Sequence, residues 1–134
     1  MQAPEWVRER LDNWGRWMAE RGQAGLGYPR SNILVAHGGR AASADHVPVD
    51  SVAAGHTHRA VQLMRADAVN LWMAIQCRYV GSPMERASRR RPMVYSEIGV
   101  LLNVTESTAR TWVLQAELQV ADTLDRWCQR PAIG

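Results

Sequence analysis

The sequence predicts an all-α protein: a small helical domain with a helix-turn-helix near its C-terminus and a tryptophan-rich helix at its N-terminus. Three observations predict this fold class. Apolar residues recur at spacings of three and four along residues 4–20, 49–80 and 95–129. A Gly-x-x-x-Asn-Val-Thr pattern interrupts the last of these stretches, as in two helices joined by a tight turn. Glycine, proline and serine gather between the helical stretches.

The first helix is expected from about Pro4 to Glu20, because proline suits a first helical position. Its apolar stripe consists of Val7, Leu11, Trp14, Trp17 and Met18. Core packing accounts for such a stripe, and a docking face for another protein is the alternative, since tryptophan is favoured at interface hot spots. Glycines 22, 25 and 27 are expected to end the helix, and a loop is expected from there to about residue 48.

We therefore divide the chain into residues 1–48, the helix with its connecting segment, and residues 49–134, a helical DNA-binding domain. The second part is expected to open with a helix capped by Asp50 or Ser51. Val52, His56, Ala60, Leu63 and Met64 are placed near one face of that helix. A further helix over about 68–80 is expected to be capped by Asp67 and to bury Leu71, Trp72, Ile75 and Tyr79.

The helix-turn-helix is expected over residues 95–114. Gly99 would let the second helix cross close to the first, and Asn103 tolerates the left-handed conformation that such a turn needs. Thr105 can cap the second helix. The two apolar stripes are Ile98, Leu101 and Leu102, then Ala109, Trp112 and Val113. The second helix is expected to continue to about residue 129, with further apolar positions that pack on earlier helices or form a homodimer or partner face.

The outward face of this second helix is the predicted DNA-reading surface. It consists of Thr105, Glu106, Ser107, Arg110 and Thr111. Side chains near the start of such a helix can reach base edges in the major groove of double-stranded DNA. Arg110 could pair with guanine, while Ser107 and Thr111 could contact phosphate or base. An ordinary helical hairpin with a polar outer face is the alternative interpretation.

A cluster of arginines directly precedes the helix-turn-helix. It comprises Arg86, Arg89, Arg90 and Arg91. Lying beside a recognition helix, these residues could contact the phosphate backbone and make DNA binding strongly salt-dependent. The alternative is a solvated loop without a partner.

Composition limits the remaining function classes. The 134 residues carry a net charge of +3, which suits a nucleic-acid partner without requiring one. All 16 basic residues are arginine, whose planar fork fits phosphate and guanine, but codon usage in a GC-rich genome is the simpler explanation of this bias. No nucleophile–base pair, phosphate loop or metal-ligand cluster stands at usable spacing, so we expect neither an enzyme nor a metal or cofactor. Cys77 and Cys128 are expected to be buried thiols. Without a signal peptide or long apolar span, the protein is expected to be cytoplasmic and not membrane-bound.

The N-terminal motif Leu-Asp-Asn-Trp-Gly-Arg-Trp at residues 11–17, followed by Gly-Leu-Gly-Tyr-Pro at 25–29, resembles the opening of phage antitermination protein Q of the phage 82 type. Members of that group close with a helical hairpin and a helix-turn-helix similar to region 4 of bacterial sigma factors. The order of the predicted elements through residue 114 agrees with that arrangement. The segment 84–93 departs from it, being longer than the short link expected there.

The resemblance implies a late-gene activator in the cytoplasm of a bacterial host. Such proteins bind promoter DNA, engage bacterial RNA polymerase with its sigma factor, and let the elongating enzyme read through terminators. Carried onto this chain, the resemblance assigns DNA reading to Thr105, Glu106, Ser107, Arg110 and Thr111. Two alternatives stay open: a helix-turn-helix regulator that acts only at initiation, and a phage DNA-packaging adaptor that assembles as a ring.

Overall fold

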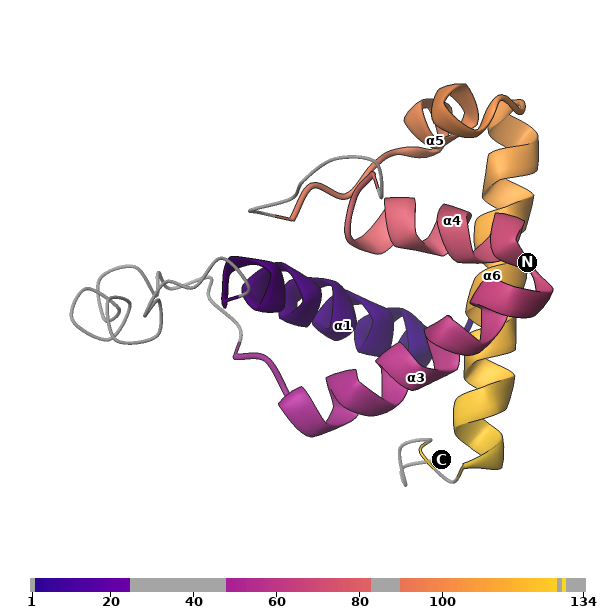
Figure 1. The fold of residues 1–134 in the computed structure, drawn as a ribbon. Helices are drawn as coiled ribbons and strands as arrows, with labels where there is room; N and C mark the ends of the chain where they lie inside the picture. The colour runs from indigo at the N-terminus through magenta and orange to yellow at the C-terminus, as the bar shows by residue number, and fades with distance from the viewer. Residues whose placement is uncertain (1, 25–47, 83–89, 128, 130–134) are drawn as a thin grey trace.

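The computed structural model describes residues 2–24, 48–82, 90–127 and 129, and these residues form helices and no strand (Figure 1). The helices are α1 (Glu5–Ala24), α3 (Ser51–Asp67), α4 (Val69–Tyr79), α5 (Tyr95–Leu102) and α6 (Glu106–Arg126). The all-α prediction is confirmed. The predictions for the loop at 25–47 and for Cys128 lie outside the described residues.

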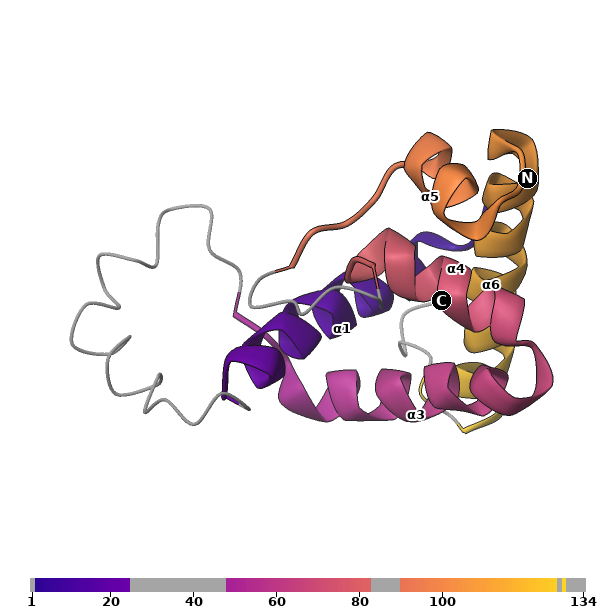
Figure 2. The same ribbon diagram turned by 45° about the horizontal axis from the view of Figure 1, so that its top comes forward.

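The long helix α6 connects the two ends of the molecule. α4 and α5 make the most extensive contacts with it, α3 packs against both α1 and α4, and α1 also reaches α4 and α6. Figures 1 and 2 show α5 and the first turns of α6 together at one end, beyond α4. The start of α6 is therefore presented at the edge of the helical body.

The main core lies between α1, α3, α4 and α6. Its largest buried side chains include Val7, Leu11, Trp14, Val61, Met64, Leu71, Ile75, Val120 and Leu124. The predicted stripe of α1 thus packs inward, with Trp17 and Met18 partly buried at its edge. The indole N–H of the fully buried Trp14 donates to Nδ1 of His58, 3.2 Å away. This bond satisfies a polar group that would otherwise be costly to bury.

A second, smaller core attaches the end of the molecule to α4. It consists of Ala74, Cys77, Met93, Ile98, Ala109 and Val113. Trp112 is partly buried and packs against both cores. Burial raises the pKa of the Cys77 thiol to about 11, so this cysteine stays protonated, as expected for a small apolar side chain. The position of α5 relative to α4 and the first turns of α6 therefore depends on this cluster.

Helix ends differ from the predictions in three places. α1 continues through Gly22 to Ala24, and α6 ends at Arg126 rather than near residue 129. Asp50 caps α3, accepting the Ala53 N–H at 3.0 Å, as predicted. Asp67, in contrast, is the last residue of α3 and caps nothing. Ala68 alone separates the two helices and is the N-cap residue of α4. Its N–H donates to the Met64 carbonyl and its carbonyl accepts the Trp72 N–H, but its methyl side chain has no oxygen that could cap α4.

Some apolar residues face the other way from the prediction. Val52 is 73% exposed and Leu63 is 54% exposed, while the buried positions of α3 are Ala54, Thr57, Ala60, Val61 and Met64. Ala60 and Met64 of the predicted face are buried, so periodicity identified part of the buried side and misplaced Val52 and Leu63. Leu101, which the periodicity places inward, is 38% exposed. Trp72 and Tyr79 of the predicted α4 stripe are only partly buried.

Candidate nucleic-acid interface

The turn between α5 and α6 has the local geometry that its residues predict. Asn103 adopts the left-handed conformation, with φ 59° and ψ 46°. The carbonyl of Gly99 accepts the Val104 N–H at 2.9 Å, which closes the end of α5. A Cβ atom on Gly99 would lie 2.8 Å from the Val104 carbonyl oxygen. The two helices thus meet at a contact that only glycine allows.

The first turn of α6 is capped by a threonine. Thr105 has an extended backbone, and its hydroxyl oxygen accepts the Thr108 N–H at 3.0 Å. The two threonine hydroxyls are also hydrogen-bonded to each other at 2.9 Å. This cap agrees with the sequence prediction, and it fixes where α6 begins relative to the turn.

All five predicted DNA-reading residues are exposed on the first turns of α6. They are Thr105, Glu106, Ser107, Arg110 and Thr111. Arg110 forms an ion pair with Glu106 one turn earlier, at 3.3 Å, and both side chains are more than half exposed. Such an exposed pair contributes little, about 0.3–0.5 kcal/mol, so Arg110 can exchange Glu106 for another anion at small cost.

Tyr95, at the start of α5, holds two arginines that the sequence did not connect with it. The guanidinium carbon of Arg78 lies 4.5 Å from the centre of the Tyr95 ring, and that of Arg110 lies 5.1 Å from it. Arg78 also donates to the Met93 carbonyl at 3.1 Å. α4, α5 and α6 thereby bring two positive charges together beside the exposed polar residues at the start of α6. Sequence patterns carry no signal for this cluster, because its members come from three helices.

The arginine cluster before α5 is described only in part. Arg86 and Arg89 lie outside the described residues. Arg90 is held in the fold: it donates to Asp12 and to the Tyr79 carbonyl, each at 2.7 Å, and its side chain is 20% exposed. Its guanidinium therefore links α1 to the end of α4, and its role as a phosphate contact stays a prediction.

Arg91, the neighbour of Arg90, is 65% exposed and lies 3.6 Å from Glu97 of α5. Its side chain is close to the surface formed by α5 and α6, and a loose, exposed ion pair of this kind is easily exchanged. Of the two cluster arginines that the structure describes, Arg91 is the more exposed.

Two kinds of feature are absent from the described part of the chain. Among residues 2–24, 48–82, 90–127 and 129, no three histidine, cysteine, aspartate or glutamate side chains come together to hold a metal ion. In the same residues, no helix combines the length and the apolar character that crossing a membrane requires.

Comparison with known proteins identifies no relative of this chain. No protein-family model matches the chain, and no curated protein or solved structure matches it significantly.

Proposed function

We propose that the chain is a DNA-binding transcription factor that reads duplex DNA with the start of α6, in a helix-turn-helix formed by α5 and α6. The observation that carries the proposal is the exposure of the five polar residues at 105–107, 110 and 111 on the first turns of a helix at one end of the molecule. A recognition helix uses this same portion, its N-terminal turns, to reach base edges.

The contacts around Arg110 support the same assignment. Its partner Glu106 is exposed, and Tyr95 supports the guanidinium from one side without neutralising its charge. Arginine in such a setting can form the paired hydrogen bonds that guanine accepts in the major groove. Ser107 and Thr111 lie on the same exposed face and would contact phosphate or base.

The fuller proposal is that this DNA binding serves phage late-gene antitermination. It rests on the resemblance of residues 11–17 and 25–29 to the phage 82 type of protein Q, together with a helix-turn-helix toward the other end of the chain. In this proposal the protein binds promoter DNA, engages RNA polymerase, and accompanies it through terminators. The part that the polymerase contacts is not assigned to residues.

Selection from a pool of random duplexes tests DNA reading and at the same time finds the preferred site. Arg110→Ala should weaken binding to the selected duplex by about 1–3 kcal/mol. The matched control is Arg126→Ala, because Arg126 forms the same kind of exposed ion pair with Asp122, 3.4 Å away, at the other end of α6. If no sequence is enriched, or if both variants bind equally, DNA reading by the start of α6 is wrong.

A run-off transcription assay with bacterial RNA polymerase and a terminator-containing template tests antitermination. The expected result is increased terminator readthrough, lost in Arg110→Ala. A change in initiation with readthrough at background would instead support a regulator that acts only at the promoter. A large ring in light scattering would support the packaging adaptor.

A further inference from the structure

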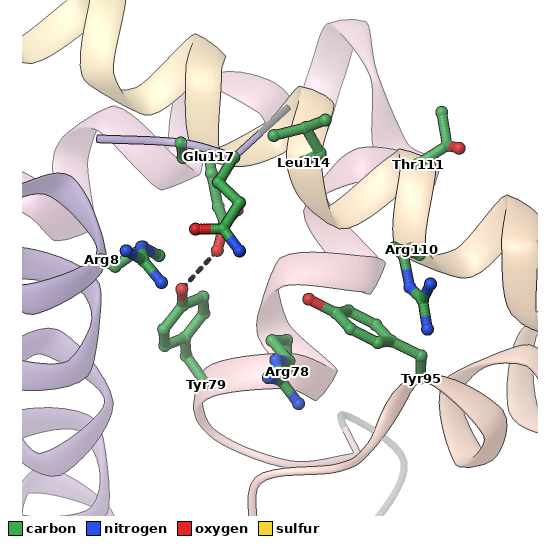
Figure 3. A pocket seen from close by; sticks show the side chains of 10 residues that line it. Arg8, Arg78, Tyr79, Tyr95, Arg110, Thr111, Leu114 and Glu117 are labelled. Atoms are coloured by element: carbon green, nitrogen blue, oxygen red, sulfur yellow. Dashed lines mark hydrogen bonds between the residues drawn. The ribbon is translucent and has the colours of Figure 1, made fainter. Parts of the chain in front are cut away.

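A cavity of about 450 Å³ lies beside the DNA-reading face, between the N-terminal segment, α4, α5 and α6 (Figure 3). We call it the arginine pocket. Its polar lining includes three arginines and two tyrosines together with one carboxylate: Arg8, Arg78, Arg110, Tyr79, Tyr95 and Glu117. Its volume falls within the range of about 300–1,000 Å³ that is usual for sites that bind small molecules.

Three guanidinium groups from three helices line this pocket. Arg8 comes from α1, Arg78 from α4 and Arg110 from α6. In the described part of the chain, no carboxylate forms an ion pair with Arg8 or Arg78, and Arg110 has only its exposed pair with Glu106. Arg8 and Arg78 both act electrostatically on Glu117, so the lining holds three positive charges against one carboxyl group. This excess of positive charge favours an anionic ligand, above all a phosphate, whose oxygens accept paired N–H donors.

The pocket also contains a hydrogen-bond acceptor at its inner wall. Glu117 of α6 is 6% exposed, and its carboxylate accepts the hydroxyl of Tyr79 (Figure 3). No other donor among the described residues reaches it. A carboxylate has room for about four hydrogen bonds, so most of its acceptor capacity is unused. Burial raises the pKa of Glu117, and N–H or O–H donors from a ligand would stabilise its charged form at this end.

The arginines favour an anion, whereas Glu117 favours hydrogen-bond donors, so a simple anion is not the best-fitting ligand. Inorganic phosphate would satisfy the arginines but would bring a second negative charge toward Glu117. A nucleotide satisfies both ends, because it carries a phosphate at one end and base N–H groups at the other. We propose that the arginine pocket binds a nucleotide, with the phosphate on Arg8, Arg78 and Arg110 and with base N–H groups donating to Glu117.

Guanine is the best-matched base, because its N1–H and its amino group stand side by side and can both donate to one carboxylate. The guanine could belong to a free nucleotide or to a nucleotide rotated out of a nucleic-acid strand. Enzymes that modify bases rotate nucleotides out of a duplex in this way. The pocket shares Arg110 and Thr111 with the DNA-reading face, so Arg8, Arg78 and Glu117 are the positions that distinguish it from that face.

Calorimetric titration of the full chain with guanosine 5′-monophosphate, guanosine and inorganic phosphate tests the proposal. The monophosphate should bind at least about tenfold more tightly than either fragment, because only it makes charge-assisted hydrogen bonds at both ends. Equal affinities for the three probes would overturn the proposal.

Arginine variants test the phosphate end. Arg8→Ala combined with Arg78→Ala should weaken monophosphate binding by roughly tenfold or more. Arg65→Ala is the matched control, because Arg65 also stacks on an aromatic ring, at 5.1 Å from Trp72, but lies outside the pocket. If loss of the Arg78 contacts to Tyr95 and Met93 disturbs folding, Arg8→Ala alone decides, since Arg8 is exposed. Unchanged affinity in the folded variant would overturn the proposal.

Glu117→Gln tests the base end with a readout that unfolding cannot mimic. The amide keeps an oxygen for the Tyr79 hydroxyl but removes the negative charge and one acceptor. Binding of the monophosphate should weaken, while binding of inorganic phosphate should become tighter, because a repulsion is removed. A shift of both affinities in the same direction would overturn the assignment of Glu117 to the base.

The last comparison separates the two sources and the two proposals. Ser107→Glu places a charge on the DNA-reading face, outside the pocket, and should abolish duplex binding while monophosphate binding persists. That result supports the pocket whether or not the start of α6 reads duplex DNA. If Ser107→Glu also loses monophosphate binding, the proposal of a nucleotide pocket separate from the DNA-reading face is wrong.

A comparison of two duplexes with the wild type identifies the source of the nucleotide. Tighter binding of a duplex with one unpaired guanosine than of the fully paired duplex identifies a nucleotide within a strand, and equal binding identifies a free nucleotide.

Discussion

Gly99 of α5 lies directly against the backbone of Val104: a Cβ atom on Gly99 would stand 2.8 Å from the Val104 carbonyl oxygen and 3.3 Å from the amide nitrogen of Glu106. Both neighbours are backbone atoms, which cannot rotate away as a flexible side chain could. The angle between α5 and α6, and with it the direction of the DNA-reading face, therefore depends on the missing side chain.

Gly99→Ala is expected to lower the free energy of unfolding by about 1–3 kcal/mol, because the added methyl group must push the turn backbone aside. The matched control is Gly55→Ala in the interior of α3, where an added Cβ meets nothing within 4 Å. That change should stabilise the protein by roughly 0.5–1 kcal/mol through helix propensity. Urea denaturation measures both, and effects of the same sign would contradict this account of the turn.

Arg90→Ala is expected to destabilise the fold without altering the salt dependence of DNA binding. Its guanidinium bridges Asp12 and the Tyr79 carbonyl, and losing these bonds should cost about 1–2 kcal/mol. Arg91→Ala, in contrast, should flatten the log–log salt slope by about 0.9, the effect of one phosphate contact. A flattened salt slope for Arg90→Ala would show that Arg90 contacts a phosphate.

Glu106→Gln is expected to strengthen DNA binding severalfold at low salt. The substitution removes a negative charge from the DNA-reading face and frees Arg110 from its ion pair at 3.3 Å. Because these side chains are exposed, the gain should shrink as salt screens the charges. Electrophoretic mobility shifts at two salt concentrations measure it, and Asp122→Gln serves as the control for a comparable pair far along α6. Weaker binding would mean that Glu106 itself contacts a base.

His58 is expected to make stability fall as the pH is lowered. Burial, with a smaller contribution from the charge of Arg21, lowers the pKa of His58 below its ordinary value of 6.5. The unfolded chain therefore binds the proton more readily than the folded one. The contribution of the neutral imidazole is fully present above pH 6.5 and is lost as the pH falls through the folded pKa.

Unfolding free energies at about pH 7.5 and about pH 5.5, on either side of the ordinary histidine pKa, measure this effect in wild type and in His58→Gln. The variant cannot take up a proton, yet its amide oxygen can still accept from Trp14, so its loss of stability between the two pH values should be smaller. Equal losses would show that other groups carry the pH dependence.

Local features were predictable because neighbouring residues decide them. Helical spacing located the helices, and the glycine, asparagine and threonine of the turn each have a conformational or capping preference that acts within a few residues. Asp67 shows where local logic failed: it is a good capping residue, but the chain bends at Ala68 instead. The prediction for Val52 and Leu63 was wrong for another reason: the neighbouring helices determine which side of α3 is buried.

By itself the sequence determined that the chain is helical, where the tight turn lies, and which polar residues the start of α6 presents. These properties follow from spacing and from bonds between residues close in the chain. Only the tertiary structure decided that Arg90 pairs with Asp12, 78 positions away, and that Arg78 and Arg110 meet at Tyr95. An arginine's sequence neighbours do not reveal whether packing will place a carboxylate, an aromatic ring or an open cavity beside it.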